Sequence, residues 1–311
     1  MDGGRHDVRG AFHRTARFRA LEWDFAVETD HPLLSAYCER VFGALRVPGD
    51  AEHWYTIRVA DASGPEGAAA RCRLELDGDL LEDTDDPARP FSVMVWHINR
   101  AVIATGDDAY VLLHASAAAI DGTAVVMPGD MEVGKTTLVT ALVRSGLQYL
   151  TDECVAVDPA NGELRAFPRS LSLDPGSWPL FPDLEPVVDP ALARFLPGQW
   201  QIPPDEIWPG AAIARARASV VVFPRYEAGA GVSLTEIARA DALVTLAGCA
   251  FNLHSAPERN LAALGEVVRG SRCFTLVYDD LAAAVTRITA LVREAGDAEA
   301  TAQVAGEGVR A

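Results

Sequence analysis

The residues best suited to chemistry form a short glycine-rich stretch near the middle of the chain. Gly129, Gly134, Lys135 and Thr136 fit the phosphate-loop pattern G-x-x-x-x-G-K-[ST]. In such a loop, backbone N–H groups converge on a phosphate at the start of a helix, where the helix dipole favours an anion. The lysine reaches the terminal phosphates, and the threonine hydroxyl binds Mg²⁺. The stretch therefore predicts a nucleotide site to which the intervening and following residues also contribute: Asp130, Met131, Glu132, Val133 and Thr137.

Two neighbouring acids follow the loop at the end of the next strand-like segment. Asp152 and Glu153 close the run LQYLTDE. Adjacent strands of an open parallel sheet end on the edge where ligands bind, so we expect Asp152 close to Lys135 and the terminal phosphate. One acid would help to hold Mg²⁺, and the other would accept a proton from an attacking hydroxyl. A solvated acidic strand end is the competing interpretation.

Three further polar residues are candidates for the same site. His114 lies in the apolar run before the loop strand, where a lone histidine is more often a core residue than a functional one. Ser116 would point to the same face of that strand as His114. Arg169 follows the acids and could bind the transferred phosphoryl group or an acidic substrate through its planar guanidinium; the alternative is a surface arginine.

The segments around the loop alternate between strands and helices, which is the context that a phosphate loop requires. We expect strands at 110–120, 122–129 and 147–158, and a helix from Lys135 that Gly146 ends. Residues 159–217 are rich in Pro, Gly and Trp and predict packed loops with short strands. The remaining elements expected are strands at 218–226 and 272–279 and helices near 239–250, 259–269 and 280–294.

The N-terminal part has a different pattern from the centre. Its apolar periodicity predicts a strand within 18–27, a helix over 31–45, antiparallel strands at 53–60 and 70–78, and a helix within 85–104. These elements predict a mixed α+β part that ends near Asp108.

Composition excludes several classes of protein. The chain has 311 residues, 49% of them hydrophobic, which predicts a packed globular protein. A net charge of −17 argues against binding to nucleic acid or to anionic membranes. The sequence has no apolar run long enough to predict a membrane span. The five cysteines are scattered without metal-site or redox spacing, so we expect reduced thiols and a cytoplasmic location.

The stretch from His114 to Val157 resembles the catalytic core of HPr kinase/phosphorylase, a bacterial serine kinase. The matching positions are His114, the loop Gly129–Thr136, Gly146, Asp152 and Glu153. The resemblance implies an α/β kinase core of the type shared with phosphoenolpyruvate carboxykinase, with ATP and Mg²⁺ as cofactors. It also implies that Asp152 is the general base and that His114 interacts with it. Glu153, where the family has Asp, would take part in Mg²⁺ binding with Thr136.

The composition and pattern along the chain predict its division. We expect a disordered tail over 1–12, an N-terminal α+β domain over 13–108, a phosphate-loop kinase domain over 109–295, whose kinase character is what the resemblance implies, and a disordered tail over 296–311. The downstream signature of the phosphorolysis activity is absent from the sequence. The layout looks more like stand-alone HPr-kinase-related proteins encoded beside peptide-modifying genes.

Three functions follow from these features. The first is an ATP-dependent kinase acting on a Ser or Thr hydroxyl of a peptide or protein, such as a ribosomally made precursor peptide, with Lys135, Asp152, His114 and Arg169 as catalytic residues. The second is a kinase of a small-molecule hydroxyl. The third is a nucleotide-binding switch without turnover. The family resemblance also implies a homo-oligomer.

Overall fold

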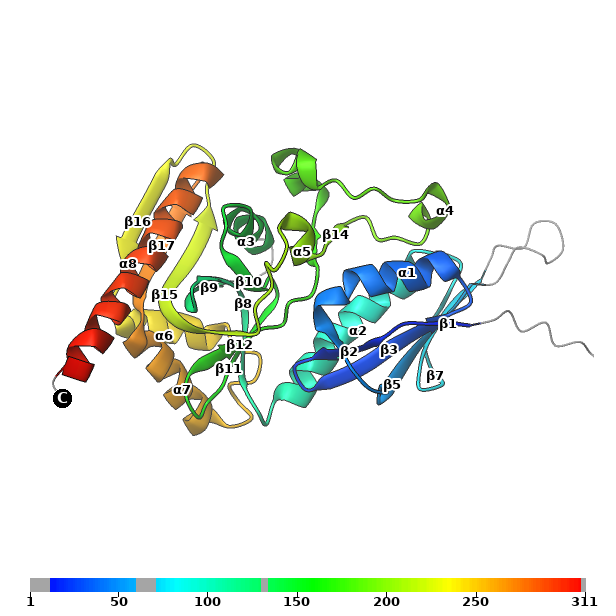
Figure 1. The fold of residues 1–311 in the computed structure, drawn as a ribbon, viewed down its shortest axis with the longest axis horizontal. Coiled ribbons are helices and arrows are strands. Elements are labelled where there is room, and N and C mark those ends of the chain that lie inside the picture. The colour runs from blue at the N-terminus through cyan, green and yellow to red at the C-terminus, as the bar shows by residue number, and fades with distance from the viewer. Residues whose placement is uncertain (1–11, 60–70, 130–133, 309–311) are drawn as a thin grey trace, which may run out of the picture. The chain divides into compact units, whose positions relative to one another are not determined.

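The computed structural model describes residues 12–59, 71–129 and 134–308, which form a mixed α/β structure (Figure 1). It divides into two compact units. The first unit comprises the chain up to Arg19, Asp24–Asn99 and Val187–Gly198, and the second comprises Ala20–Trp23, Arg100–Pro186 and the chain from Gln199. The contacts thus divide the chain within a helix at Asn99, and a segment at 187–198 returns to the first unit.

The first unit is built on one sheet with the strand order β4-β2-β3-β5-β6-β7, and β1 pairs with β3. Its strands are β1 (His13–Arg14), β2 (Arg17–Ala20), β3 (Trp23–Thr29), β4 (Arg46–Val47), β5 (His53–Val59), β6 (Cys72–Leu76) and β7 (Asp79–Thr84). Its helices are α1 (Pro32–Val41), η1 (Gly43–Leu45), α4 (Pro190–Ala193) and α2 (Arg89–Gly106), which continues into the second unit. Buried aromatic rings at Phe18, Phe25, Phe42 and Tyr55 contact one another in its core.

The expected helix at 31–45 is present as α1 followed by η1, and the strand expected at 53–60 is confirmed over His53–Val59. The expected strand within 18–27 is instead two strands, because Leu21 adopts a φ of 52° between β2 and β3. A positive φ is incompatible with extended backbone. The chain therefore turns where the apolar pattern alone suggests continuity.

The second unit contains an eight-stranded sheet and a small two-stranded one. The large sheet consists of β8 (Val111–Ile120), β9 (Thr123–Pro128), β10 (Gln148–Thr151), β11 (Cys154–Val157), β12 (Glu163–Arg165), β15 (Arg215–Tyr226), β16 (Val232–Glu236) and β17 (Arg272–Tyr278). The small sheet pairs β13 (Leu171–Leu173) with β14 (Trp200–Ile202). The helices are α3 (Lys135–Arg144), η2 (Pro175–Leu180), η3 (Pro182–Leu184), α5 (Pro204–Ile207), α6 (Arg239–Gly248), α7 (Pro257–Gly270) and α8 (Leu281–Gly308).

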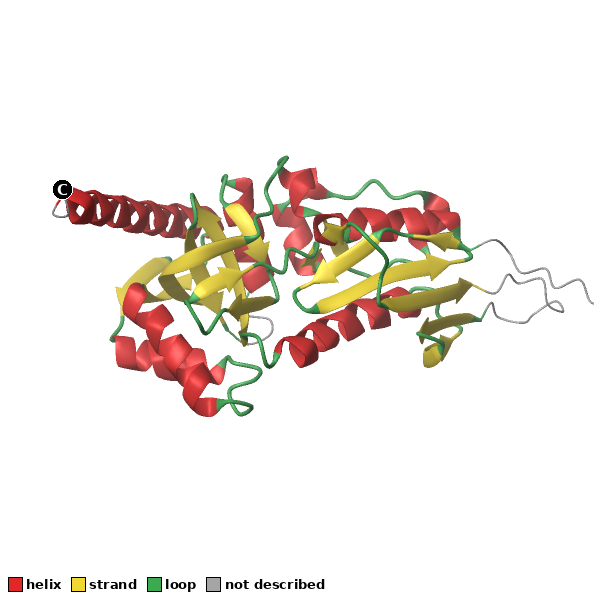
Figure 2. Ribbon diagram, turned by 60° about the horizontal axis from the view of Figure 1, so that its bottom comes forward, coloured by secondary structure: helices red, strands yellow, loops and turns green. Residues whose placement is uncertain are grey.

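Helices cover both faces of the large sheet (Figure 2). One core cluster joins alternate strand residues, such as Ala118 and Val222, to Leu138 of α3 and Ile288 of α8. A second cluster joins the intervening strand residues to the inner faces of α6 and α7. Because successive strand residues point to opposite faces, the strand positions in the first cluster mark the face that carries α3.

The sheet is mixed rather than parallel, which corrects the open parallel sheet expected from the sequence. β9, β15 and β17 run parallel, whereas β8 is antiparallel to β9, to β10 and to β11. β10 and β11 together form one line of pairing along β8. The single strand expected at 147–158 is therefore present, but it is interrupted at Asp152 and Glu153 rather than ended by them.

Two other segments bear on the sequence expectations. Residues 159–217 do contain packed loops with short elements, in which the rings of Trp178 and Trp200 stack at 4.8 Å. The C-terminal segment differs from the expected tail, because α8 continues as a helix to Gly308. Its alanines and glutamates have high helix propensity, which explains helix formation without apolar patterning. Residues 1–11 of the other expected tail lie outside the described part.

Candidate active site

The first and last residues of the phosphate-loop motif lie within the described part, and a left-handed backbone is found at Gly134. The N–H of Gly129, just after β9, donates to the carbonyl of His114 at 3.3 Å. Gly134 has a φ of 84° and is the N-cap of α3. A Cβ on this glycine would lie 3.2 Å from the hydroxyl of Tyr278, so both backbone and surroundings favour glycine. The predicted nucleotide-binding residues Asp130, Met131, Glu132 and Val133 lie outside the described residues.

Lys135 opens helix α3 and is 6% exposed. Its Nζ donates a 2.8 Å hydrogen bond to the carbonyl of Gly129, so the ammonium lies between the two ends of the loop. Glycine at the N-cap has no side chain to accept from the first N–H groups of α3, so it leaves these donors uncapped by that residue. Thr136 is partly buried beside Lys135, and the Thr137 hydroxyl bonds to that of Ser177 at 2.7 Å.

A buried cluster surrounds Asp152 in the interruption between β10 and β11. The Tyr149 hydroxyl donates to its Oδ1 at 2.9 Å, and the Ser172 N–H donates to its Oδ2 at 3.2 Å. Arg169 donates to Oδ2 from Nη2 at 3.3 Å and places Nε 3.2 Å from Oδ1. The side chain of Asp152 is 0% exposed. A buried carboxylate is stable only when it is paired and hydrogen-bonded, and this one is both.

Arg169 joins the two acids. It is also 3.3 Å from Glu153 and donates to the Ser172 hydroxyl at 3.1 Å. Burial acts to lower the pKa of Arg169, but the charges of Asp152 and then Glu153 outweigh it, so the pKa lies above its ordinary value. The guanidinium is therefore a permanent positive charge between two carboxylates.

Tyr149 and Ser172 are site residues that the sequence did not reveal. Burial, and next the charge of Asp152, raises the pKa of Tyr149 well above its ordinary value, so its hydroxyl stays protonated and donates. Tyr149 looks like any core residue of an apolar strand in the sequence. Ser172 contributes through its backbone N–H, for which no sequence signal exists.

The register of β8 places the acids level with the start of the loop. Ala115 and Ser116 pair with Pro128 and Met127 on the β9 side. On the other side, Cys154 pairs with His114 and Thr151 with Ala117, which puts Asp152 and Glu153 opposite Ser116 and Ala115. Two strand spacings, about 10 Å, therefore separate the backbone of Asp152 from the end of β9. An antiparallel strand, β8, thus stands between Asp152 and the end of β9, and the expected closeness of Asp152 to Lys135 stays a prediction.

His114 and Ser116 share the face of β8 that carries α3, since Ala118 on the same alternation belongs to that core. The Ser116 hydroxyl is fully buried without a hydrogen-bond partner among the described residues. The His114 ring lies 5.4 Å from that of Phe251, and its backbone contacts Gly129 and Cys249. Its predicted interaction with Asp152 stays a prediction.

A Mg²⁺ site in a kinase uses one or two protein oxygens together with the substrate phosphates. Thr136 has a hydroxyl oxygen that could bind Mg²⁺. Glu153 has a carboxylate that is 31% exposed and pairs with Arg169, so it could reach a bound cation. Within the described ranges, no group of three or more His, Cys, Asp or Glu side chains could hold a metal by itself. The assignment of these two residues to Mg²⁺ stays a prediction.

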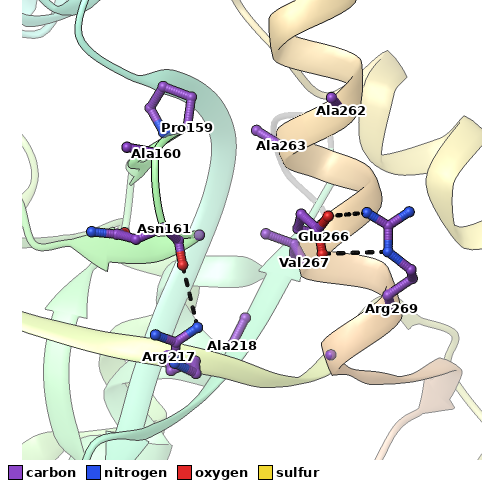
Figure 3. Close-up of a pocket in the computed structure, with 12 residues that line it drawn as sticks. Pro159, Ala160, Asn161, Arg217, Ala218, Ala262, Ala263, Glu266, Val267 and Arg269 are labelled. Carbon is purple, nitrogen blue, oxygen red and sulfur yellow. Dashed lines mark hydrogen bonds and ion pairs between the residues drawn. The ribbon is translucent and has the colours of Figure 1, made fainter.

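A cavity of about 690 Å³ lies elsewhere in the second unit, between the turn after β11 and helix α7 (Figure 3). Its charged residues already have partners: Arg269 bonds to Glu266, and Arg217 donates to the Asn161 carbonyl at 3.3 Å. The cavity lies at the amino end of β15, where Arg217 and Ala218 line it. The phosphate-loop motif instead follows the carboxyl end of β9, which runs parallel to β15. Ligands of α/β sheets bind at the carboxyl ends of strands. We therefore place the candidate site at the loop.

No protein-family model matches the chain, and no curated protein matches it. Among solved structures, it is similar to the HPr(Ser) kinase/phosphatase from Coxiella burnetii, with 13% sequence identity and a TM-score of 0.30. The similarity covers 59% of this chain and 94% of that one. This likeness is too distant to decide function, which we argue from the geometry of the chain itself. Within the described part, no helix is both long and apolar enough to span a membrane.

Proposed function

We propose that this protein is a kinase that uses ATP and Mg²⁺ to phosphorylate a Ser or Thr hydroxyl of a peptide or protein. One observation carries the proposal: a buried, hydrogen-bonded carboxylate, Asp152, is separated by a single strand, β8, from the strand β9 that precedes the phosphate-loop motif and the helix beginning at Lys135. Phosphoryl transfer needs these two parts, a cradle for the polyphosphate and a carboxylate that orients the acceptor hydroxyl.

The loop side would bind and neutralise the donor. The N-terminus of α3, whose dipole favours an anion, and the Lys135 ammonium, which contacts the Gly129 carbonyl just after β9, would hold the polyphosphate. Mg-ATP, when bound, supplies the phosphoryl group and a cation that offsets its charge. Thr136 and the accessible carboxylate of Glu153 would hold that cation.

Asp152 would orient the acceptor hydroxyl and accept its proton. A general base must come within hydrogen-bond reach of that hydroxyl, whereas Arg169 and Ser172 cover Asp152 here. Arg169 provides the means to uncover it. Its guanidinium binds phosphoryl oxygens at least as well as carboxylates, so the γ-phosphoryl group of bound ATP would draw it away from Asp152 before the acceptor hydroxyl attacks. His114, on the face of β8 that carries α3, would then interact with Asp152.

The nature of the acceptor rests on the resemblance of residues 114–157 to a kinase of protein serine. A small-molecule hydroxyl kinase would use the same side chains, and a switch would bind the nucleotide without needing Asp152. A cytoplasmic location and a homo-oligomeric assembly are likewise proposals from the sequence.

Transfer of a labelled γ-phosphoryl group tests the proposal. The protein is incubated with Mg²⁺, γ-labelled ATP and Ser- or Thr-containing peptides encoded by its genomic neighbours, and products are read by mass spectrometry. We expect a peptide heavier by one phosphoryl group. Label on metabolites alone would establish the small-molecule kinase, and ATP binding without any transfer would establish the switch.

A further inference from the structure

Two tyrosines end the parallel strands that follow the loop strand across the sheet. β15 ends at Tyr226 and β17 at Tyr278, and these two residues are register partners. β15 also pairs in parallel with β9, with Val221 opposite Val126. Continuing this register, Tyr226 lies three residues beyond Pro128, about 10 Å past the end of β9. The tyrosines therefore lie beyond the carboxyl end of β9, the strand that precedes the phosphate-loop motif in the sequence.

Both rings lie on the face of the sheet that carries α3. Tyr278 belongs to the core cluster that includes Leu138 of α3, and Tyr226 shares the alternation of Val220 and Val222 in that cluster. The Tyr278 hydroxyl reaches the N-cap of α3, where it would lie 3.2 Å from a Cβ on Gly134. Tyr278 is thus directly next to the start of the helix, and Tyr226 contacts Tyr278.

The two tyrosines differ in how they are held. Tyr278 is 3% exposed, and burial, followed by its neighbour Tyr226, raises its pKa to about 12. Tyr226 packs against it edge to face, with ring centroids 5.9 Å apart, yet remains 59% exposed. A large aromatic ring that is fixed by a buried partner and open to solvent offers a flat surface at little entropic cost of ordering.

The strand order places Tyr226 and Asp152 on opposite sides of β9. Asp152 lies two strands from β9 on the β8 side, and Tyr226 lies one strand away on the opposite side. A nucleotide whose phosphates sit at the start of α3, with its terminal phosphate toward Asp152, would extend its base toward Tyr226. We propose that Tyr226, supported by Tyr278, is the surface on which the base of a purine nucleoside triphosphate stacks. This inference rests on the proposed function and adds the base contact to it.

Comparing a nucleotide with a bare polyphosphate isolates the base contact. Binding of ATP and of tripolyphosphate, each with Mg²⁺, is measured by calorimetry for the wild type, Tyr226→Leu and Tyr226→Phe. Leu keeps an apolar side chain without a ring. Because Tyr226 is exposed, neither substitution should disturb the fold, and circular dichroism checks this. We expect Tyr226→Leu to bind ATP about tenfold more weakly, the size of one base–aromatic stack, and to bind tripolyphosphate unchanged. Tyr226→Phe should bind both ligands like the wild type.

Each other outcome overturns a distinct claim. Equal ATP affinity in wild type and Tyr226→Leu would overturn the stacking surface while leaving the kinase proposal intact. An equal loss for both ligands would show that Tyr226 acts on the phosphate site rather than on the base. A wild-type protein that binds neither ligand would contradict the proposed function, and the base contact with it.

Discussion

The two halves of the candidate site are built in different ways. On the loop side, Gly129, Gly134 and Lys135 lie within one short stretch, and their conformation follows from local backbone geometry at a helix start. On the carboxylate side, Asp152 is held by Tyr149, Arg169 and Ser172, which come from separate elements. Binding groups here are local in sequence, whereas the group proposed for proton transfer depends on long-range packing.

The difference predicts how each half responds to mutation. Residues on the loop side should change ligand binding more than stability, because their conformation is set within one short stretch of chain. Residues of the carboxylate cluster should change stability together with activity, because a buried charge without its partner is costly.

Removing the guanidinium should have the largest effect on stability. Arg169→Met leaves two carboxylates without their shared cation, so we expect the free energy of unfolding to fall by about 3–5 kcal/mol. Arg144→Met is the matched control, since Arg144 pairs with Asp183 at the surface and such pairs contribute at most about 1 kcal/mol. Urea unfolding measures both. Equal losses in the two variants would show that the cluster is not the buried ion-pair site described.

Lys135→Met tests the loop side. The substitution keeps the buried stem and removes the ammonium, so we expect phosphoryl transfer to fall about 10²–10³-fold, as when one charge-stabilising donor is lost. ATP binding, measured by calorimetry, should weaken in parallel, whereas the unfolding midpoint should stay close to that of the wild type. Unchanged ATP binding would remove the phosphate-site assignment.

Much of this site was visible in the sequence, but unevenly. The left-handed backbone at Gly134 and the helix that begins at Lys135 follow from a motif whose residues act locally. Arg169 was a candidate for a phosphoryl contact, yet its pairing with both acids depends on how the chain returns after β12. The mixed sheet was missed, because a buried antiparallel strand such as β8 reads in the sequence like a parallel one. Tyr149 was missed because its role comes from a neighbour three residues away across a strand interruption.

Tyr149→Phe sharpens the picture of the cluster. The variant loses the hydrogen bond to Asp152, and we expect about 1.5–3 kcal/mol less stability at neutral pH. The raised pKa of Tyr149 adds a pH effect: its stabilising contribution is full below pH 10, where the unfolded phenol is also neutral, and is lost as pH rises above that value. Between pH 7 and 11, the free energy of unfolding should therefore fall less steeply with rising pH in Tyr149→Phe than in the wild type. An unchanged slope would mean that the phenol is not buried against Asp152.

Two glycines offer the smallest and most selective test. Gly134 and Gly146, at the two ends of α3, have φ values of 84° and 99°, so alanine at either should cost about 1–2 kcal/mol of stability. A Cβ meets Tyr278 only at Gly134, while Gly146 has open space around it. Gly134→Ala alone should weaken ATP binding by calorimetry. A similar loss in Gly146→Ala would trace the effect to general strain in the helix.

Asp152→Asn separates the two halves most directly. The variant keeps the volume of the side chain, and Glu153 still pairs with Arg169, so a folded protein can be verified by circular dichroism before assay. With Mg²⁺ and labelled ATP, we expect phosphoryl transfer to the acceptor to fall about 10²–10⁴-fold while the dissociation constant for ATP stays unchanged. Full transfer activity in this variant would contradict the role of Asp152 as the base, and with it the account of this protein as a two-part kinase site.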